Sequence, residues 1–303
     1  MRYAITRRVL GEKRSVDVTE AEFREAKAAK TKLMHALSIE EKLDYVLGNF
    51  SEVERQLLDA ALHNMLFSDV SWSKAVAGVH TISRRIVNLL TACRLYLDQV
   101  AHHVREVYGG GSPEAQSLED KKSEEYNSHL GYRVMDALRN HVQHRGLPVS
   151  GVTQHSERLH RSPDSLFKNT VTPWLKVASL AEDPKFKKSV LKELQAIGDR
   201  VDIKPLIREY VASIGAVHAI VRERMKQDIA DWEAVLTSIL DRFKAAGGDL
   251  VGLAVVAMDE KGAYVDYVDV FDDLLKRRKQ LEAKNRHLTH IAKHFVTSEV
   301  YRA

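Results

Sequence analysis

The 303-residue chain has a single cysteine, Cys93, which excludes an internal disulfide and a zinc site built from several thiolates. A chain without a disulfide framework is typical of a reducing compartment, so we expect a cytoplasmic protein. The longest apolar run, Leu250 to Met258, is too short to cross a bilayer, and the N-terminal segment lacks the apolar core of a signal peptide. We therefore expect no membrane partner.

Glycine and proline are also scarce, with 15 and 6 residues. This scarcity excludes a β fold with many turns and favours long, uninterrupted helices. Hydrophobic residues make up 44% and charged residues 29%, which is enough apolar material for a large core. The sequence has no glycine-rich phosphate loop, no H-E-x-x-H and no G-x-S-x-G, so the usual signals of nucleotide hydrolysis, zincin proteolysis and α/β-hydrolase chemistry are missing. We predict a mainly α protein with a small β element.

The first half of the chain shows clear helical signals. Capping boxes at 19–22 and 38–41 each predict the start of a helix. Apolar residues then recur every three or four positions until three glycines end the pattern at 109–111. A last stripe is formed by Leu130, Val134, Leu138 and Val142. The prediction is an extended arm over 1–18, helices from 19 to 35, from 38 onward and over 79–107, a polar loop at 112–122, and a helix from about 124 to 145.

The second half is more mixed. Residues 250–258 and 263–268, joined by a short turn, predict a β-hairpin that is a natural partner for the N-terminal arm in one small sheet. The other expected elements are an irregular histidine-rich connection at 151–164, a short strand at 171–177, a short helix at 185–195, one or two helices over 205–243 and a basic helix over 269–300. The predicted domains are the arm at 1–18, a helical domain at 19–245, and the hairpin plus basic helix at 246–303.

The end of the last helix in the first half carries the most specific pattern. Residues 138–146 read Leu-Arg-Asn-His-Val-Gln-His-Arg-Gly, so Arg139 and His144 are separated by four residues and Asn140 follows the arginine. This pattern resembles the signature of the HEPN superfamily, an arginine and a histidine separated by four to six residues. The long helix around residues 83–98 is similar to the one that packs beside the motif in that superfamily. The resemblance covers about the first half of the chain and implies an antiparallel helical bundle.

The resemblance also implies an activity, a metal-independent endoribonuclease without a cofactor. RNA carries its own nucleophile, the 2′-hydroxyl, so the protein must only move protons and neutralise phosphate charge. A histidine such as His144 does the first and an arginine such as Arg139 does the second, while Asn140 positions one of them. The expected products carry 2′,3′-cyclic phosphate and 5′-hydroxyl ends. Such proteins often act as toxins or phage-defence effectors, with an antitoxin or another regulatory protein as partner.

Helix geometry adds a constraint on this site. Five residues turn an α-helix by about 500°, so Arg139 and His144 point about 140° apart. By the resemblance, a homodimer solves this problem by lining one composite site with two copies of the motif. Subgroups that are controlled by a partner nucleotidyltransferase have a tyrosine two residues after the histidine. Gly146 stands there, so this control is not expected.

Basic residues near the motif and at the C-terminus are candidate RNA contacts: His141, Arg145, Arg286, His290 and Lys293. Three alternatives stay open from the sequence. The cationic end of the motif helix could only complement the helix dipole. The histidines at 141, 144, 155 and 160 could bind zinc. The basic face of the predicted C-terminal helix could be solvated or face a dimer partner. The alternative function is a non-catalytic helical module that binds RNA or a protein.

Overall fold

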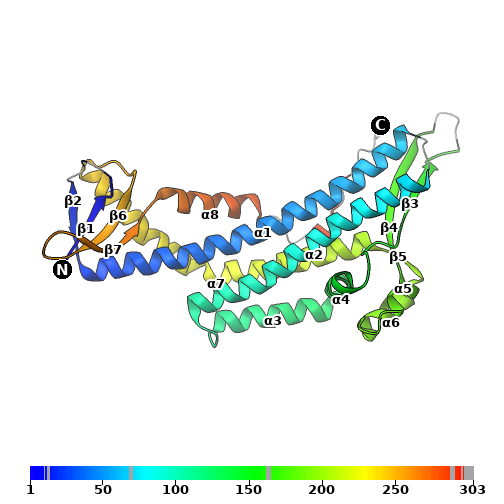
Figure 1. Ribbon diagram of the computed structural model, residues 1–303, viewed down its shortest axis with the longest axis horizontal. Coiled ribbons are helices and arrows are strands. Elements are labelled where there is room, and N and C mark those ends of the chain that lie inside the picture. Colours follow the sequence, from blue (N-terminus) through cyan, green and yellow to red (C-terminus); the bar gives the residue numbers. More distant parts are fainter. Residues whose placement is uncertain are drawn as a thin grey trace. The chain divides into compact units, whose positions relative to one another are not determined.

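The computed structural model describes residues 1–9, 11, 14–67, 71–161, 165–286, 291–294 and 296. This part of the chain is mainly helical, as predicted, with eight α-helices and two small antiparallel sheets (Figure 1). The helices are α1 (Glu20–Leu66), α2 (Trp72–Tyr108), α3 (Pro113–Ser128), α4 (Leu130–His144), α5 (Val177–Ala181), α6 (Lys188–Ile197), α7 (Ile203–Ala245) and α8 (Asp272–Lys284). The strands are β1 (Arg2–Arg7), β2 (Ser15–Val18), β3 (Gly151–Arg158), β4 (Phe167–Lys176), β5 (Arg200–Asp202), β6 (Leu253–Met258) and β7 (Tyr264–Asp269). No helix among these residues is long and apolar enough to cross a bilayer.

The chain forms two compact units, each built from segments that are distant in the sequence. The first unit contains residues 1–41, 99–117 and 220–286, and the second contains 42–98, 118–219 and the residues from 287 onward. Helices α1, α2, α3 and α7 contribute residues to both units. The whole of α4, which carries the Arg139–His144 motif, belongs to the second unit.

The first unit is organised around a four-stranded antiparallel sheet with the strand order β2-β1-β6-β7. In the register of β1, Tyr3 pairs with Val18 on one side and with Ala257 on the other, so the predicted pairing of arm and hairpin is confirmed. One face of the sheet shares an apolar core with α1, α7 and α8. The capping box of α1 is also confirmed, because the Thr19 amide donates to Glu22 at 2.6 Å and the Glu22 amide donates to the Thr19 hydroxyl at 3.2 Å.

Two predicted boundaries in the first half of the chain are wrong. The break before residue 38 is absent, because α1 continues to Leu66; no glycine or proline interrupts residues 20–47, and Ala36, Leu37 and Ile39 are buried. The predicted loop at 112–122 is the helix α3. Ser112 caps α3 by accepting the amide of Ala115 at 3.1 Å, and proline at the next position suits a first helical turn. As a result, α4 begins at Leu130 and not near residue 124.

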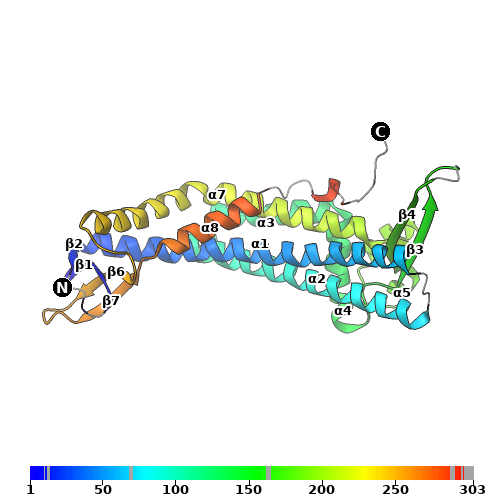
Figure 2. The ribbon, with the colours of Figure 1, turned by 90° about the horizontal axis from the view of Figure 1, so that it is seen from above.

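Two predictions in the second half are also wrong. The connection at 151–164 contains the strand β3, which pairs along its whole length with β4, while β5 completes this second sheet. The hairpin of β3 and β4 extends away from the helices of its own unit (Figure 2). The basic helix expected over 269–300 ends at Lys284, and residues 291–293 form a separate 3-10 turn.

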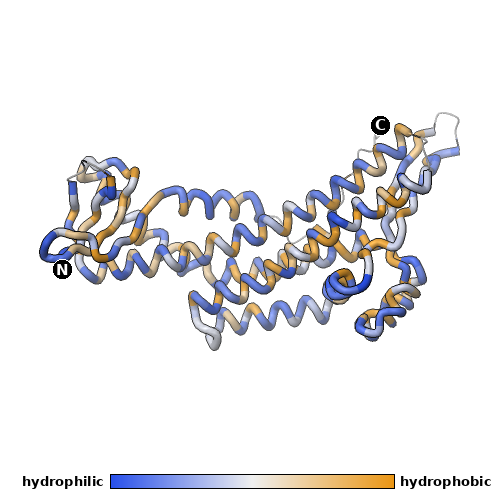
Figure 3. The backbone as a smooth tube through the Cα atoms, in the orientation of Figure 1, coloured by the Kyte–Doolittle hydropathy of each residue, from blue (hydrophilic) through white to orange (hydrophobic). Residues whose placement is uncertain are grey.

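In the second unit, apolar positions recur along α2, α4 and α7, whereas α3 is mostly hydrophilic (Figure 3). Ile86 and Cys93 of α2, Val134 and Leu138 of α4, and Ile214 of α7 have no exposed surface. Burial raises the pKa of the Cys93 thiol well above its ordinary range, so this cysteine is a packing residue. The core of this unit therefore holds the apolar stripe of α4 in place.

Candidate active site at the end of α4

The start of α4 packs closely on the backbone of α7. The Gly131 amide donates a hydrogen bond to the Glu209 carboxylate. A Cβ atom on Gly131 would lie 2.5 Å from the Leu206 carbonyl oxygen, closer than any real contact, so only glycine fits this approach. One residue further, the rings of Tyr132 and Tyr210 meet edge to face with centroids 5.1 Å apart. These contacts fix where α4 begins relative to α7.

Arg133 ties α4 to two further helices. Its guanidinium donates to both carboxylate oxygens of Glu193 on α6, at 3.2 and 2.6 Å. Its Nη1 atom also donates to the carbonyls of Tyr126 and Asn127 in the last turn of α3, at 2.9 and 2.6 Å. The hydrogen bond to Glu193 raises the pKa of Arg133. A single, largely buried guanidinium therefore aligns the motif helix with α3 and α6.

The far end of α4 carries the motif and remains regular. The helix extends to His144, and the Arg145 amide donates to the His141 carbonyl at 2.8 Å, which is ordinary α-helical bonding. Because the last turn is not distorted, Arg139 and His144 keep the separation of about 140° that five helical residues give. Arg139 is half-buried and His144 is exposed. The two side chains of one protomer therefore do not converge on a single atom.

The motif side chains have few polar partners in the part of the chain that the structure describes. Nη1 of Arg139 donates to the side-chain oxygen of Asn140 at 3.1 Å, so the asparagine contacts the arginine. Within the described part of the chain, the His144 imidazole makes no hydrogen bond, and no side chain of Arg139, His144 or Arg145 donates to a carbonyl at the helix end. Side-chain capping of the last turn is therefore not seen.

His141, by contrast, is held firmly. Its Nδ1 atom lies 2.8 Å from a carboxylate oxygen of Asp183, and the side chains are only 11% and 5% exposed. The other oxygen of Asp183 accepts the Lys185 amide at 3.0 Å and lies 3.8 Å from Nε of Arg145. The hydrogen bond from His141 holds the pKa of Asp183 below its ordinary value. Since an ionised carboxylate only accepts hydrogen bonds, Nδ1 of His141 carries a proton and Nε2 is the atom that can bind one.

Asp183 is the site residue that sequence reasoning missed. It lies 42 residues after His141, in the turn that follows α5, and no motif surrounds it. Nε2 of His141 faces the chain just beyond the helix, where a Cβ atom on Gly146 would be 3.3 Å away. The Phe186 ring stands nearly perpendicular to the imidazole of His141, with the ring centroids 6.1 Å apart.

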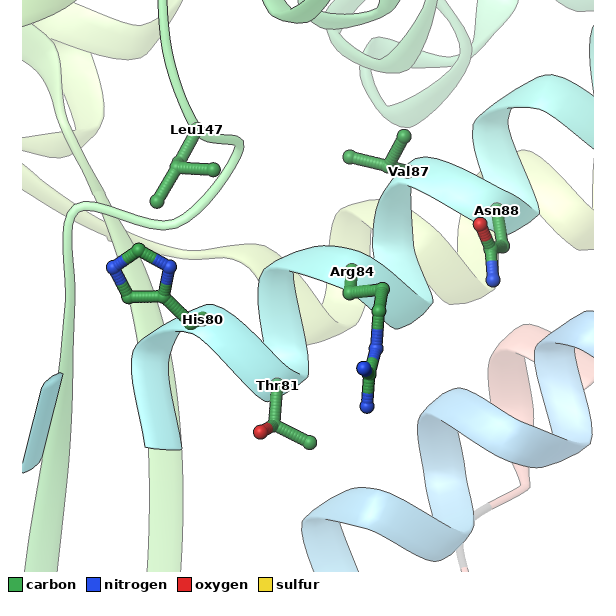
Figure 4. A pocket seen from close by; sticks show the side chains of 6 residues that line it. All are labelled: His80, Thr81, Arg84, Val87, Asn88 and Leu147. Atoms are coloured by element: carbon green, nitrogen blue, oxygen red, sulfur yellow. The ribbon is translucent and has the colours of Figure 1, made fainter. Parts of the chain in front are cut away.

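A groove adjoins the motif. Its volume is about 360 Å³, and it is lined by His80, Thr81, Arg84, Val87 and Asn88 of α2 and by Leu147 (Figure 4). Leu147 follows His144 by three residues, so the Cα path between them is at most about 11 Å. The groove therefore lies within short reach of the motif.

The predicted contacts outside α4 lie elsewhere. Arg286 is exposed in the first unit, Lys293 is exposed in the 3-10 turn, and His290 lies outside the described residues. Arg286 and Lys293 therefore do not lie on one helix as expected, because α8 ends at Lys284. His155 and His160 lie on and just beyond β3, and in the described part of the chain no group of three or more potential ligands is placed to hold a metal ion.

The end of α4 thus combines a guanidinium, a free imidazole and an imidazole that is oriented by a carboxylate. Imidazoles transfer protons near neutral pH, and a guanidinium stabilises the charge of a phosphate. This set is suited to phosphodiester chemistry. Comparison of the chain with protein-family models, with curated proteins and with solved structures gave no match in any of the three.

Proposed function

We propose that the protein is a metal-independent endoribonuclease of HEPN type, in which α4 is the motif helix of a HEPN-like bundle. The observation that carries the proposal is the state of Arg139 and His144, which lie at the end of an anchored helix and have no carboxylate partner among the described residues. Arg133, Arg208 and Arg222 instead form two-pronged ion pairs with glutamates. A guanidinium without a carboxylate partner is available for a phosphate.

The reaction needs two proton transfers. The RNA 2′-oxygen attacks the neighbouring phosphorus while an imidazole removes its proton, and the bond from phosphorus to the 5′-oxygen breaks while that oxygen receives a proton. His144 acts as general base or acid in these steps. Arg139 stabilises the charge that builds on the phosphoryl oxygens, and Asn140 positions its guanidinium. His141 and Arg145, one turn apart, flank the same helix end and contact the RNA.

The proposed protein is a homodimer. Arg139 and His144 of one protomer point in different directions, so a second copy is needed to bring an arginine and a histidine to one phosphate. The resemblance further implies a role as a toxin or phage-defence effector, held in check by an antitoxin or another regulatory protein.

Cleavage of total RNA and of transfer RNA by the purified protein in EDTA tests the proposal. Wild type is expected to leave 2′,3′-cyclic phosphate and 5′-hydroxyl ends. Arg139→Ala and His144→Ala are each expected to lower kcat by at least about 100-fold, the range that general acid-base groups contribute. Both variants should first be shown to melt and sediment like wild type.

Two exposed residues of the second unit serve as controls. His155→Ala removes a solvent-exposed imidazole from β3, and Arg94→Ala removes a guanidinium that pairs with Asp98 on α2. Neither is expected to change cleavage. Cleavage that survives both motif variants would refute the assignment, and RNA binding without cleavage would favour the alternative of a non-catalytic RNA-binding module.

A further inference from the structure

The groove beside the motif is formed by one face of α2. Its five α2 residues, from His80 to Asn88, span an arc of about 120° and about 12 Å of helix. Arg84, Thr81 and Asn88 extend to the same side of α2, and His80 lies beside Leu147 (Figure 4). The groove is therefore lined mainly by polar groups, and Val87 and Leu147 are its apolar lining residues.

Of the four polar side chains in the groove, only Thr81 has a hydrogen-bond partner in the part of the chain that the structure describes, since its hydroxyl donates to the Ala77 carbonyl at 2.9 Å. Among the described residues, the side chains of His80, Arg84 and Asn88 form no hydrogen bond or ion pair. The other arginines of this part of α2 do have acidic partners, since Arg85 pairs with Glu52 and Arg94 with Asp98. Arg84 is thus an exposed cation in the groove, with no carboxylate partner among the residues that the structure describes.

The surrounding sequence makes the groove cationic. Residues 71–97 include four lysines or arginines and no aspartate or glutamate. None of the six lining residues is acidic. A groove with one fixed positive charge, an amide and an imidazole favours an anionic ligand with hydrogen-bonding groups, and its volume lies within the range of small-ligand sites.

We propose that this groove binds one nucleotide of single-stranded RNA next to the linkage that is cleaved. Arg84 contacts the phosphate, Asn88 hydrogen-bonds to the base edge, and the base lies between Val87 and Leu147. His80 contacts the ribose or the base from the Leu147 side. The subsite rests on the proposed ribonuclease function, because the short path from His144 to Leu147 is what places it beside the scissile phosphate.

Binding is measured with a fluorescent 2′-O-methyl RNA of about ten nucleotides, a length in the range of single-strand sites. This probe lacks the 2′-hydroxyl nucleophile, so binding is separated from cleavage. Arg84→Ala is expected to raise Kd about tenfold and to reduce the slope of log K against log salt by about 0.7, the value for one lost phosphate contact with a single strand. Asn88→Asp, which places a negative charge in the groove, is expected to raise Kd at least as much.

Arg94→Ala is the matched control, because it removes the same charge from the same helix about 15 Å further along. The Kd of Arg94→Ala should stay within about twofold of the wild-type Kd. With cleavable RNA, Arg84→Ala should raise KM and change kcat less than about threefold, as expected for a residue that binds substrate and transition state equally.

The outcomes separate the two proposals. A loss of binding in Arg84→Ala that Arg94→Ala does not share supports nucleotide binding in the groove, even if the wild type cleaves no RNA and the nuclease proposal fails. If the wild type cleaves RNA but Arg84→Ala and Asn88→Asp keep the wild-type Kd and KM, the nuclease stands and the subsite is refuted. Equal loss in Arg84→Ala and Arg94→Ala would also refute it, because the effect would then be general electrostatics.

Discussion

Nδ1 of His141 lies 2.8 Å from Oδ2 of Asp183, and this contact joins the motif helix to the turn after α5. It makes the two histidines of α4 unlike each other. His141 is fixed by a buried carboxylate, whereas His144, three residues later, is exposed. An imidazole that exchanges protons with a substrate needs access, which favours His144 for that role and assigns His141 to orientation and contact.

The Asp183 carboxylate predicts how stability depends on pH. The hydrogen bond from His141 is the main cause of a lowered pKa of Asp183 in the folded state. The contribution of Asp183 to the free energy of unfolding is therefore present above the unfolded pKa of about 3.9 and is lost as the pH falls through the folded-state pKa. Urea unfolding of wild type and Asp183→Asn should therefore show wild type to be the more stable at pH 6, with the difference shrinking below about pH 4. A difference that stays constant down to pH 3 would show that the charge of Asp183 is not responsible.

The close approach of α4 and α7 predicts a severe effect of a single methyl group. In Gly131→Ala the new Cβ would lie 2.5 Å from the Leu206 carbonyl oxygen, which is backbone and cannot rotate away. We expect a loss of about 1–3 kcal/mol in the free energy of unfolding, the usual cost of overpacking. Because α4 must shift, RNA cleavage should fall as well.

Gly48→Ala is the matched control for that substitution. Gly48 lies inside α1, and nothing is within 4 Å of the position that its Cβ would occupy. Alanine there should stabilise the protein by about 0.5–1 kcal/mol, because glycine is the poorer helix former. Stabilisation of both alanine variants would show that α4 and α7 leave room for a methyl group at position 131.

The two-pronged pair of Arg133 and Glu193 predicts that lysine cannot replace this arginine. A lysine side chain would keep the charge but could not reach both Glu193 and the two carbonyls of α3 at once. Arg133→Lys should cost about 1–3 kcal/mol of unfolding free energy, and a double-mutant cycle with Glu193→Gln should give a coupling of at least about 0.5 kcal/mol. Arg24→Lys, in an exposed pair with Glu20, should change stability by less than about 0.5 kcal/mol.

The helices that could be predicted are those whose apolar residues mark a buried face. Val134 and Leu138 repeat at helical spacing and are completely buried, so the sequence pattern of α4 and its structure agree. In α3 the pattern is weak because the helix is stabilised by charge pairs, such as Lys121 with Glu125 at 2.8 Å. A run of charged residues without an apolar stripe looks like a loop, which explains that error.

Apart from the pairing of the N-terminal arm with the hairpin, the contacts between distant segments could not be predicted. Residues of β3 are mostly exposed on both faces, so the strand has no alternation of polar and apolar residues that would reveal it. The partner of His141 depends on where the turn after α5 lies in space, and the sequence around Asp183 contains no signal for it. The motif itself could be found because it is local, but the groove on α2 and the carboxylate behind His141 require the fold.

The directions of Arg139 and His144 lead to the sharpest test of the composite site. If each active centre takes its arginine from one protomer and its histidine from the other, Arg139→Ala and His144→Ala should complement each other. A heterodimer of the two variants contains one protomer with an intact arginine and one with an intact histidine, so it should regain about half of the wild-type activity. The variants are co-expressed with different affinity tags, and heterodimers are selected through both tags.

The control for this experiment pairs a His144→Ala protomer with a protomer that carries both substitutions. That heterodimer has no His144 in either protomer, so it should stay inactive. The heterodimers selected through both tags could instead be folded and associated but inactive. This result would mean that each protomer needs its own arginine and histidine. The helix end would then have to deform when RNA binds, because a regular α4 keeps the two side chains about 140° apart. Recovery in the heterodimer, and only there, would instead mean that the regular helix seen in the structure is already the active form, with the second copy supplying the group that one protomer cannot bring to the phosphate.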